Sequence, residues 1–243
     1  MKRPINTLFL LQSLDGKINP WSNNSLSQWR EFGKIKGLRE WVMQYYKLEQ
    51  ETDLYSLNSW KVMKKIWMND ENYNFEIYSE VSFIIIDSKH LNKIAVEKMA
   101  SKLKKLFIIT TNKNHIAFSL QDKYKNLEIL YYEEKIDFKN MMEKLYKKYN
   151  IENITIQSWW SLNSVFFENN LIDKISVVIA PVVIWWKDTP TLVDGKSIEK
   201  MEDLNKLKVL KLRKINQLKY WYIHLEYDVE EKTEIVEGID VPN

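Results

Sequence analysis

Polar side chains follow four apolar runs that are predicted to be strands, at the points where those runs end. These polar segments are 13–17 (Ser-Leu-Asp-Gly-Lys), 87–89 (Asp-Ser-Lys), 110–112 (Thr-Thr-Asn) and 158–163 (Ser-Trp-Trp-Ser-Leu-Asn). The carboxyl ends of parallel strands form the ligand crevice of an open α/β sheet, so these hydroxyl, carboxylate and amide groups could bind one polar ligand together. Taken one at a time, the same residue types also favour turns and helix caps. The four segments predict a binding site only when they are considered jointly.

Common local motifs for catalysis are absent from the sequence. It has no GxGxxG fingerprint, no P-loop, no HExxH and no G-x-S-x-G. The three histidines, His90, His115 and His224, have no second histidine at helical ligand spacing. We therefore expect each histidine at the surface or at an edge, and we predict no metal site. The lack of cysteine excludes disulfides, thiol catalysis and cysteine-based metal sites.

Short runs rich in Ile, Val, Leu or Phe alternate with segments of helical spacing. The predicted strands cover 5–11, 54–57, 83–87, 106–110, 127–131, 153–157 and 174–180. The predicted helices cover 37–50, 60–67, 94–102, 138–149 and 162–170. Strands separated by helices indicate βαβ units, so we expect an α/β fold with a mostly parallel central sheet flanked by helices. Two further runs, 207–215 and 220–229, predict a C-terminal antiparallel hairpin.

The composition favours one globular domain. The chain has 243 residues, of which 45% are hydrophobic and 28% charged, and its net charge is +3. Its longest apolar runs are about ten residues, half the length of a membrane-spanning helix, and its weak, mixed basicity gives no footprint for nucleic acid. We interpret the N-terminal apolar run as the first strand and not as a signal peptide, and expect a cytoplasmic protein. We expect a single domain over residues 1–229 and a weakly ordered acidic tail over 230–243.

Four features, in order along the chain, resemble one enzyme family. They are SLDGK at 13–17, the Asp87-Ser88 turn, the helix start Ser161-Leu162-Asn163, and the stretch 172–195, which reads IDKISVVIAPVVI, two residues, then KDTPTLVDG. Over most of its length the chain resembles the pyrimidine reductase of riboflavin biosynthesis, which has a dihydrofolate-reductase-like fold. The resemblance implies an NADPH-dependent homodimer that reduces a phosphorylated ribosylaminopyrimidine by hydride delivery to the sugar C1.

The resemblance also assigns roles to individual residues. It implies a cofactor pyrophosphate at Trp159, Trp160, Ser161 and Leu162, an adenosine end near Asp87 and Ser88, and a 2′-phosphate near Lys89, with Ser59 and Thr110 on the same cofactor side. It implies that Ser13 and Asn163 face the pyrimidine and sugar, and that Asp188 and Thr189 border the same crevice. Asp15 is the implied catalytic residue, either as a proton donor or as a group that orients the substrate.

Two departures from the family pattern affect this assignment. The first departure lies in the turn that opens the helix after the second predicted strand. Many family members have a Thr there and an Asp four residues later, and this chain has Lys61 and Lys65 at those two positions. Where the family has paired glycines, it has Trp159–Trp160 and Trp185–Trp186, and tryptophans at 21, 41, 60, 67 and 221 also stand where glycine would suit the pattern.

The chain carries ten Trp and five Gly, which is consistent with a reductase scaffold whose glycines have been replaced. Glycine accepts positive φ and lets a pyrophosphate approach the backbone. We therefore expect strained turns, at roughly 1–3 kcal/mol for each Trp held at positive φ. We also expect the indoles to crowd a dinucleotide.

Other functions stay open on this pattern. One is a dihydrofolate-reductase-like oxidoreductase that acts on a pterin or another imine. A second is a catalytically silent binding or structural protein that keeps the fold and cannot take the cofactor. Binding of single-stranded nucleic acid is the least favoured, because most aromatic residues lie within predicted strands and helix faces and not on an exposed basic face.

Overall fold

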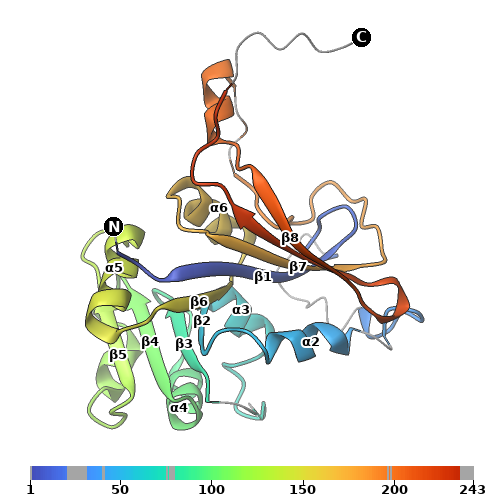
Figure 1. Ribbon diagram of the computed structural model, residues 1–243. Coiled ribbons are helices and arrows are strands. Elements are labelled where there is room, and N and C mark those ends of the chain that lie inside the picture. Colours follow the sequence, from blue (N-terminus) through green and yellow to red (C-terminus); the bar gives the residue numbers. More distant parts are fainter. Residues whose placement is uncertain are drawn as a thin grey trace, which may run out of the picture.

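The computed structural model describes residues 2–20, 32–39, 42–74, 76, 80–195, 197 and 199–235. The expectations for Trp21, Trp41 and the tail after residue 235 lie outside these residues. In the described part of the chain, nine strands form one sheet in the order β5-β4-β3-β2-β6-β1-β7-β9-β8 (Figure 1).

Most strands and helices lie close to the predicted ranges. The strands are β1 (Ile5–Ser13), β2 (Tyr55–Ser59), β3 (Ser82–Ile86), β4 (Lys105–Thr110), β5 (Leu127–Tyr131), β6 (Asn153–Gln157), β7 (Lys174–Ala180), β8 (Leu210–Gln217) and β9 (Ile223–Val229). The α-helices are α2 (Met43–Glu49), α3 (Trp60–Lys65), α4 (Lys93–Lys102), α5 (Phe138–Tyr149) and α6 (Trp160–Glu168), and the 3₁₀ helices are η1 (Ile116–Leu120), η2 (Met201–Lys206) and η3 (Lys219–Trp221).

The sheet is parallel from β5 to β7 and antiparallel at β9 and β8. This confirms the predicted α/β fold with a mostly parallel sheet and a C-terminal antiparallel hairpin. The hairpin connection lies two residues later than predicted, because β8 runs on to Gln217 and η3 forms part of the turn. A register shift between Leu212 and Lys214 interrupts the pairing of β8 with β9.

Helices cover both faces of the parallel sheet. Successive strand residues point to opposite faces, so Ile84 packs into a core with α5 and α6, while Ile85 packs into a second core with α4 and η1. A third core lies where α2 packs on β1 and β7, around Phe9 and Val178. The parallel strands are thus buried on both faces, which explains their nearly continuous apolar sequences.

Helix α5 has the predicted bounds because its own residues define both ends. The Asp137 side chain accepts a hydrogen bond from the Asn140 N–H (2.9 Å) at the start, and Asn150 takes the left-handed conformation (φ 55°) at the end. Met141 and Leu145 are four residues apart and buried on the same face.

Two of the tryptophans expected at glycine positions do have positive φ. Trp67 has φ 61° and Trp221 has φ 66°, and neighbouring Tyr220 has φ 55°. The expectation was wrong for Trp60 and for the two tandem pairs, because none of these five residues has positive φ. Trp159 has φ −83° and ψ 151° and Trp160 is the first residue of α6. An extended residue followed by a helix start is a conformation that any residue adopts, so that turn is not strained by φ.

Replacing Trp221 with Gly should stabilise the protein. The Trp221 side chain is 72% exposed, so little packing is lost, whereas a bulky residue in the left-handed region costs roughly 1–2 kcal/mol. We expect Trp221→Gly to raise the free energy of unfolding by about 1 kcal/mol in urea titrations. Trp186→Gly is the control, since Trp186 is also exposed (52%) but has negative φ, and it should bring no gain. Equal effects of the two changes would show that φ at position 221 is not strained.

Candidate functional site

The polar segments that follow the strands lie along one edge of the sheet. Parallel pairing joins β3 to β2, β2 to β6 and β6 to β1, so the carboxyl ends of these four strands are neighbours. Asp87, Ser59, Ser158 and Ser13 stand at or just after these ends. We call this the carboxyl edge. It brings together segments that are up to 150 residues apart in sequence, as the sequence analysis predicted.

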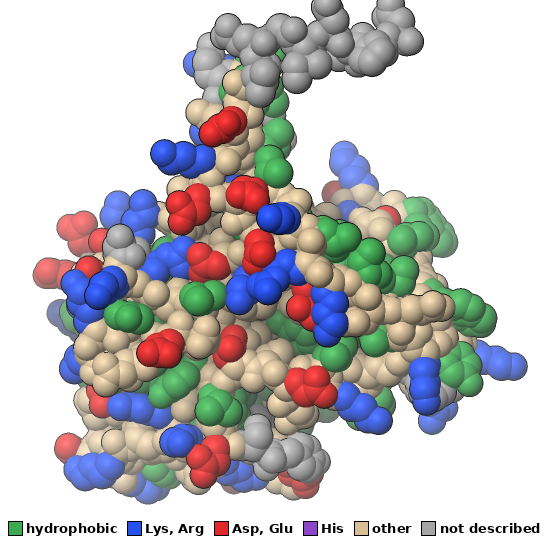
Figure 2. All heavy atoms as spheres, viewed as in Figure 1, with side chains coloured by type: hydrophobic (Ala, Val, Ile, Leu, Met, Phe, Trp, Pro, Cys, Tyr) green, Lys and Arg blue, Asp and Glu red, His purple; other side chains and the backbone are tan. Residues whose placement is uncertain are grey.

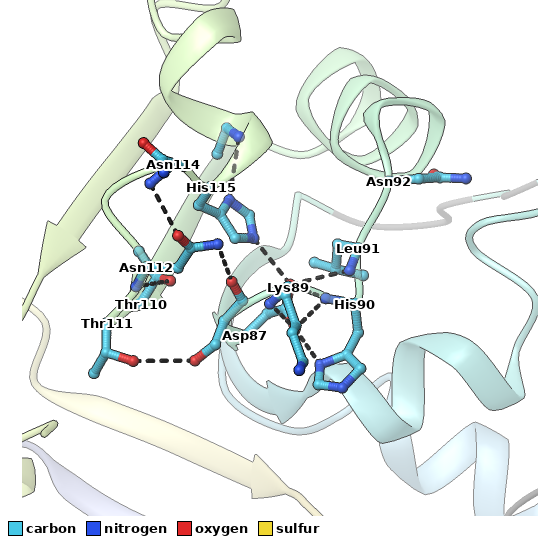
Figure 3. A network of polar contacts seen from close by, with 12 residues as sticks. Asp87, Lys89, His90, Leu91, Asn92, Thr110, Thr111, Asn112, Asn114 and His115 are labelled. Carbon is cyan, nitrogen blue, oxygen red and sulfur yellow. Dashed lines mark hydrogen bonds and ion pairs between the residues drawn. The ribbon is translucent and has the colours of Figure 1, made fainter.

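At the β3 end of this edge, Asp87 is the centre of a buried polar network (Figure 3). His115 Nε2 lies 2.9 Å from Asp87 Oδ2, and His90 Nδ1 lies 3.0 Å from Asp87 Oδ1. The backbone N–H groups of His90 and Leu91 also donate to the carboxylate, at 3.0 to 3.1 Å. Asp87 is 1% exposed, so these contacts replace nearly all of its hydration.

This network keeps Asp87 ionised. Burial alone would raise the pKa of the Asp87 carboxyl, but hydrogen bonds from His115, Leu91 and His90 outweigh it and lower the pKa to about 2. The His115 Nδ1 accepts a hydrogen bond from the Ala117 N–H (3.1 Å), so the ring proton lies on Nε2 and is donated to Asp87.

The residues around Asp87 hold the tips of β3 and β4 together. Ser88 Oγ lies 3.2 Å from Thr111 Oγ1, and Asn112 Nδ2 donates to the Ser88 carbonyl (2.7 Å). Thr110 is buried and its Oγ1 accepts from the Asn112 N–H (3.1 Å). Lys89 is exposed at the same tip. Of the predicted adenosine-side residues, Ser88 and Lys89 are therefore accessible, whereas Asp87 and Thr110 act as internal supports.

At the middle of the edge, α6 begins with unpaired backbone donors. Trp159 is the N-cap residue of α6 and supplies no side-chain cap, because an indole has no acceptor. In the described part of the chain, no group accepts from the N–H groups of Trp160 and Ser161. Next to them, on β2, Ser59 Oγ is buried and has no hydrogen-bond partner in the same part of the chain. Donors of this kind at a helix N-terminus can bind an anion.

At the β1 end, Asp15 lies in a tight turn that begins at Ser13. Ser13 Oγ donates to Asp15 Oδ1 (2.6 Å), and the Ile184 N–H donates to the same oxygen (2.8 Å). Gly16 has φ +80° in this turn, where glycine is the favoured residue. Lys17 Nζ donates to the Thr189 carbonyl (3.0 Å), which ties the turn to segment 187–190.

The Asp15 carboxyl is exposed and ionised. Partial desolvation alone would raise the pKa of the Asp15 carboxyl. The hydrogen bonds from the Ile184 N–H and from Ser13, together with the Lys17 charge, outweigh it and lower the pKa below its ordinary value. A carboxylate is an acceptor and a poor proton donor near neutral pH. Of the two roles predicted for Asp15, orientation of a substrate N–H or O–H fits this environment better than proton donation.

The remaining predicted substrate residues fall into two groups. Asn163 is fully buried, accepts from Ser158 Oγ (2.5 Å) and donates to the Leu192 carbonyl (2.7 Å). Thr189 is buried and donates to the Trp186 carbonyl (2.6 Å). Asp188 is exposed beside it. The side chains of Asn163 and Thr189 therefore hold neighbouring loop backbone in place, whereas the carboxylates of Asp188 and Asp15 are exposed.

The prediction for the histidines was wrong for two of the three. His115 and His224 are buried, and only His90 is partly exposed. His115 escaped notice because its partner, Asp87, lies 28 residues away on the neighbouring strand tip. The available signal was its position just after Thr110-Thr111-Asn112, a segment already expected at the carboxyl edge.

Two features are missing from the part of the chain that the structure describes, a cluster of metal-binding side chains and a membrane-spanning helix. The described residues contain no group of three or more His, Cys, Asp or Glu side chains that could hold a metal ion. None of their helices is long and apolar enough to cross a membrane. Figure 2 shows Lys and Arg interspersed with Asp and Glu over the viewed face, in keeping with the mixed charge of the sequence.

Comparison with known proteins gives a family match over most of the chain. The model of the RibD C-terminal domain family matches residues 4–219. A reductase of Aquifex aeolicus is 27% identical over 77 residues, and one of Methanothermobacter thermautotrophicus is 31% identical over 75 residues. Both are named 2,5-diamino-6-ribosylamino-4(3H)-pyrimidinone 5′-phosphate reductase. The matched stretches cover 32% and 31% of this chain and 34% of each relative.

Solved structures support the fold. RibD of Acinetobacter baumannii aligns with 94% of this chain and 58% of its own, at a TM-score of 0.65 and 16% identity. The riboflavin biosynthesis reductase Rib7 of Saccharomyces aligns with 94% of this chain and 90% of its own, at a TM-score of 0.58 and 13% identity. At these identities the likeness concerns the fold alone.

Changing Asp87 to Asn should destabilise the protein and remove part of its acid sensitivity. The native pKa of Asp87, about 2, lies below its ordinary value of 3.8, so the ionised network stabilises the fold at neutral pH. That stabilisation, about 2 kcal/mol, is lost as the pH falls from about 4 to about 2. We expect Asp87→Asn to lower the free energy of unfolding at pH 7 by at least this amount and to flatten its fall below pH 4.

Urea titrations from pH 7 to pH 2 measure both effects. Asp188→Asn, at an exposed position, serves as the control and should leave the pH profile unchanged. A variant at position 87 with the stability and the acid profile of the parent would mean that the network contributes nothing to folding.

Proposed function

The chain belongs to the RibD C-terminal domain family, and on that premise we propose that it is an NADPH-dependent reductase of a phosphorylated ribosylaminopyrimidine, which delivers hydride to the sugar C1 and yields the ribitylamino product. The observation that carries this proposal is the carboxyl edge, where the two predicted sides of the site adjoin. In this proposal the cofactor would lie along the ends of β3, β2 and β6, and the substrate would lie at β1 and segment 187–190, which are neighbours through the order of the strands.

The residues of the edge fit a dinucleotide in their chemistry. Unpaired N–H groups at the start of α6 and the unpartnered Ser59 Oγ suit a diphosphate. Ser88 and Lys89 are accessible at the β3 tip, where a hydroxyl and a cation suit a ribose with a 2′-phosphate. When bound, the nicotinamide would supply the hydride.

The protein's own residues then have to orient the substrate and exclude water. Asp15 would accept a hydrogen bond from a substrate N–H or O–H, with its carboxylate fixed by Ser13 and by the Ile184 N–H. The Lys17 to Thr189 hydrogen bond would hold segment 187–190 closed beside it. Alignment of a donor and an acceptor in this way supplies much of the rate in hydride-transfer enzymes.

A second copy of the chain is the proposed partner. Strand β8 is an edge strand, and it exposes Leu212 (47%) and Ile215 (61%). Exposed apolar side chains on an unpaired edge are typical of association surfaces. A protomer mass in light scattering at micromolar concentration would contradict the homodimer.

Turnover assays distinguish the proposed substrate from a pterin. The ribosylaminopyrimidine phosphate and dihydrofolate are offered separately, with NADPH loss followed by its absorbance, and NADH replaces NADPH in a parallel series. We expect oxidation of NADPH by the pyrimidine substrate alone, and less activity with NADH because Lys89 would pair with the 2′-phosphate. Reduction of dihydrofolate alone would instead identify the dihydrofolate-reductase-like alternative.

Asp15→Ala should lower turnover by at least tenfold at nearly unchanged stability. The Asp15 side chain is exposed and accepts hydrogen bonds from Ser13 Oγ and from the Ile184 N–H, so its loss costs little apolar packing. Loss of alignment between a bound donor and acceptor can cost about 10²-fold in rate. Steady-state rates and melting temperatures are compared with those of Asp122→Ala, which removes an exposed carboxylate outside the proposed site. Full turnover in Asp15→Ala would reduce Asp15 to a turn-forming residue.

Replacing Trp159 and Trp160 with Gly should strengthen NADPH binding. The physical reason is space at the start of α6, since φ at Trp159 is already unstrained. Each 1.4 kcal/mol recovered corresponds to about tenfold in affinity. Fluorescence titration of NADPH measures the gain, and the same change at Trp185 and Trp186, which lie beyond β7, should help less.

The outcome also bears on the catalytically silent alternative. That alternative is favoured by one observation, the buried indole of Trp159 at the proposed diphosphate position. If the parent chain binds no NADPH up to millimolar concentration and the double glycine variant binds it, the scaffold is competent and the indoles block it. If neither binds, the start of α6 is not the pyrophosphate site.

A further inference from the structure

Lys61 lies in the first turn of α3, between the tips of β2 and β6. Its Nζ is 5.9 Å from the ring centroid of Trp60, 6.0 Å from that of Trp159 and 5.8 Å from that of Trp160. Trp60 belongs to α3, whereas the other two indoles begin α6. The ammonium group is therefore held where the two helices start side by side on the carboxyl edge.

The charge of Lys61 is not neutralised by the protein. In the described part of the chain no carboxylate lies within ion-pair distance of its Nζ. Indole faces attract a cation through their quadrupole, yet they carry no formal charge. The three rings hold the ammonium group and leave it able to pair with an anion.

Unused hydrogen-bond donors occur in the same two segments, at the end of β2 and at the start of α6. The N–H groups of Trp160 and Ser161 have no acceptor among the described residues. Ser59 Oγ, in a residue only 5% exposed, also lacks a partner in that part of the chain. A buried hydroxyl without a partner is costly, and a ligand oxygen would satisfy it.

We propose that Lys61 is the cationic anchor for a diphosphate group in the ligand of this site. The inference rests on the proposed function, since the dinucleotide cofactor is the diphosphate that the site would take. The α6 N–H groups would contact the diphosphate from the β6 side, and the Lys61 ammonium, a compact charge with three donors, would contact it from the β2 side. At position 61, where many family members have a neutral Thr, this chain would thus offer the positive charge of a lysine.

The position of Lys61 is fixed through Trp60. The Trp60 ring stacks on the His90 ring, with centroids 3.5 Å apart and planes 6° apart. His90 in turn is bonded to Asp87, the centre of the buried network. This chain of contacts joins the proposed diphosphate anchor at the start of α3 to the proposed adenosine side at the end of β3.

Titration with inorganic pyrophosphate tests the proposal directly. The three indoles around Lys61 provide a fluorescence signal for an anion bound beside them. We expect saturable binding to the parent chain and at least tenfold weaker binding to Lys61→Met. Lys64→Met is the matched control on the exposed side of the same helix and should bind like the parent. Lys61→Arg, which keeps the charge, should bind more tightly than Lys61→Met.

Two outcomes would overturn the proposal. One is equal pyrophosphate affinity in the parent and in Lys61→Met, and the other is no binding to the parent up to millimolar concentration. A third outcome would contradict the proposed function and leave the role of Lys61 intact. In that outcome pyrophosphate binds through Lys61, but NADPH does not bind even after Trp159 and Trp160 are replaced by Gly. Circular dichroism confirms that each variant is folded.

Discussion

Parallel pairing of β6 with both β2 and β1 is the constraint on which the site depends. The register places Ile5 beside Asn153 on one side of β6 and Ser56 beside Thr155 on the other. Strand β6, which comes late in the sequence, therefore places the carboxyl ends of β1 and β2 on either side of its own carboxyl end. Ile154 and Ile156 are fully buried in one core, and Thr155 between them is buried on the opposite face of the sheet. A slip of one residue would exchange these two faces and misalign the polar tips. Fold and site are thus determined by the same pairing.

The carboxyl edge divides its polar groups between support and binding. Asp87, Thr110 and Asn163 are buried and use their side chains to hold neighbouring strand tips and loops. Asp15 and Lys89 remain accessible on either side. The least satisfied groups lie between them, at Ser59 and at the start of α6. A polyanionic ligand that spans the edge would satisfy the middle and reach both accessible ends.

Local sequence signals predicted the bounds of many strands and helices. They did not predict the side-chain contacts between segments that are distant in sequence. Strands β5, β6 and β7 and helix α5 have the predicted bounds, because caps, turns and apolar periodicity lie within each segment. Burial of His115 could not be predicted, since it depends on Asp87, which is 28 residues away at the tip of the neighbouring strand. Lys61 was known only as a departure from a family pattern, and its three indole neighbours come from two helices. Glycine-like backbone was predicted for Trp67 and Trp221 and is confirmed there, whereas the tandem tryptophans have ordinary φ.

A crystal structure of the Trp159→Gly/Trp160→Gly variant with bound NADP⁺ tests the central claim most directly, that the carboxyl edge between β3 and β1 binds a dinucleotide. The predicted result is a diphosphate within hydrogen-bond distance of the N–H groups of residues 160 and 161 and of the Lys61 ammonium, with the adenosine toward Ser88 and Lys89 and the nicotinamide toward Asp15. A cofactor bound elsewhere, or with its diphosphate away from the start of α6, would contradict it.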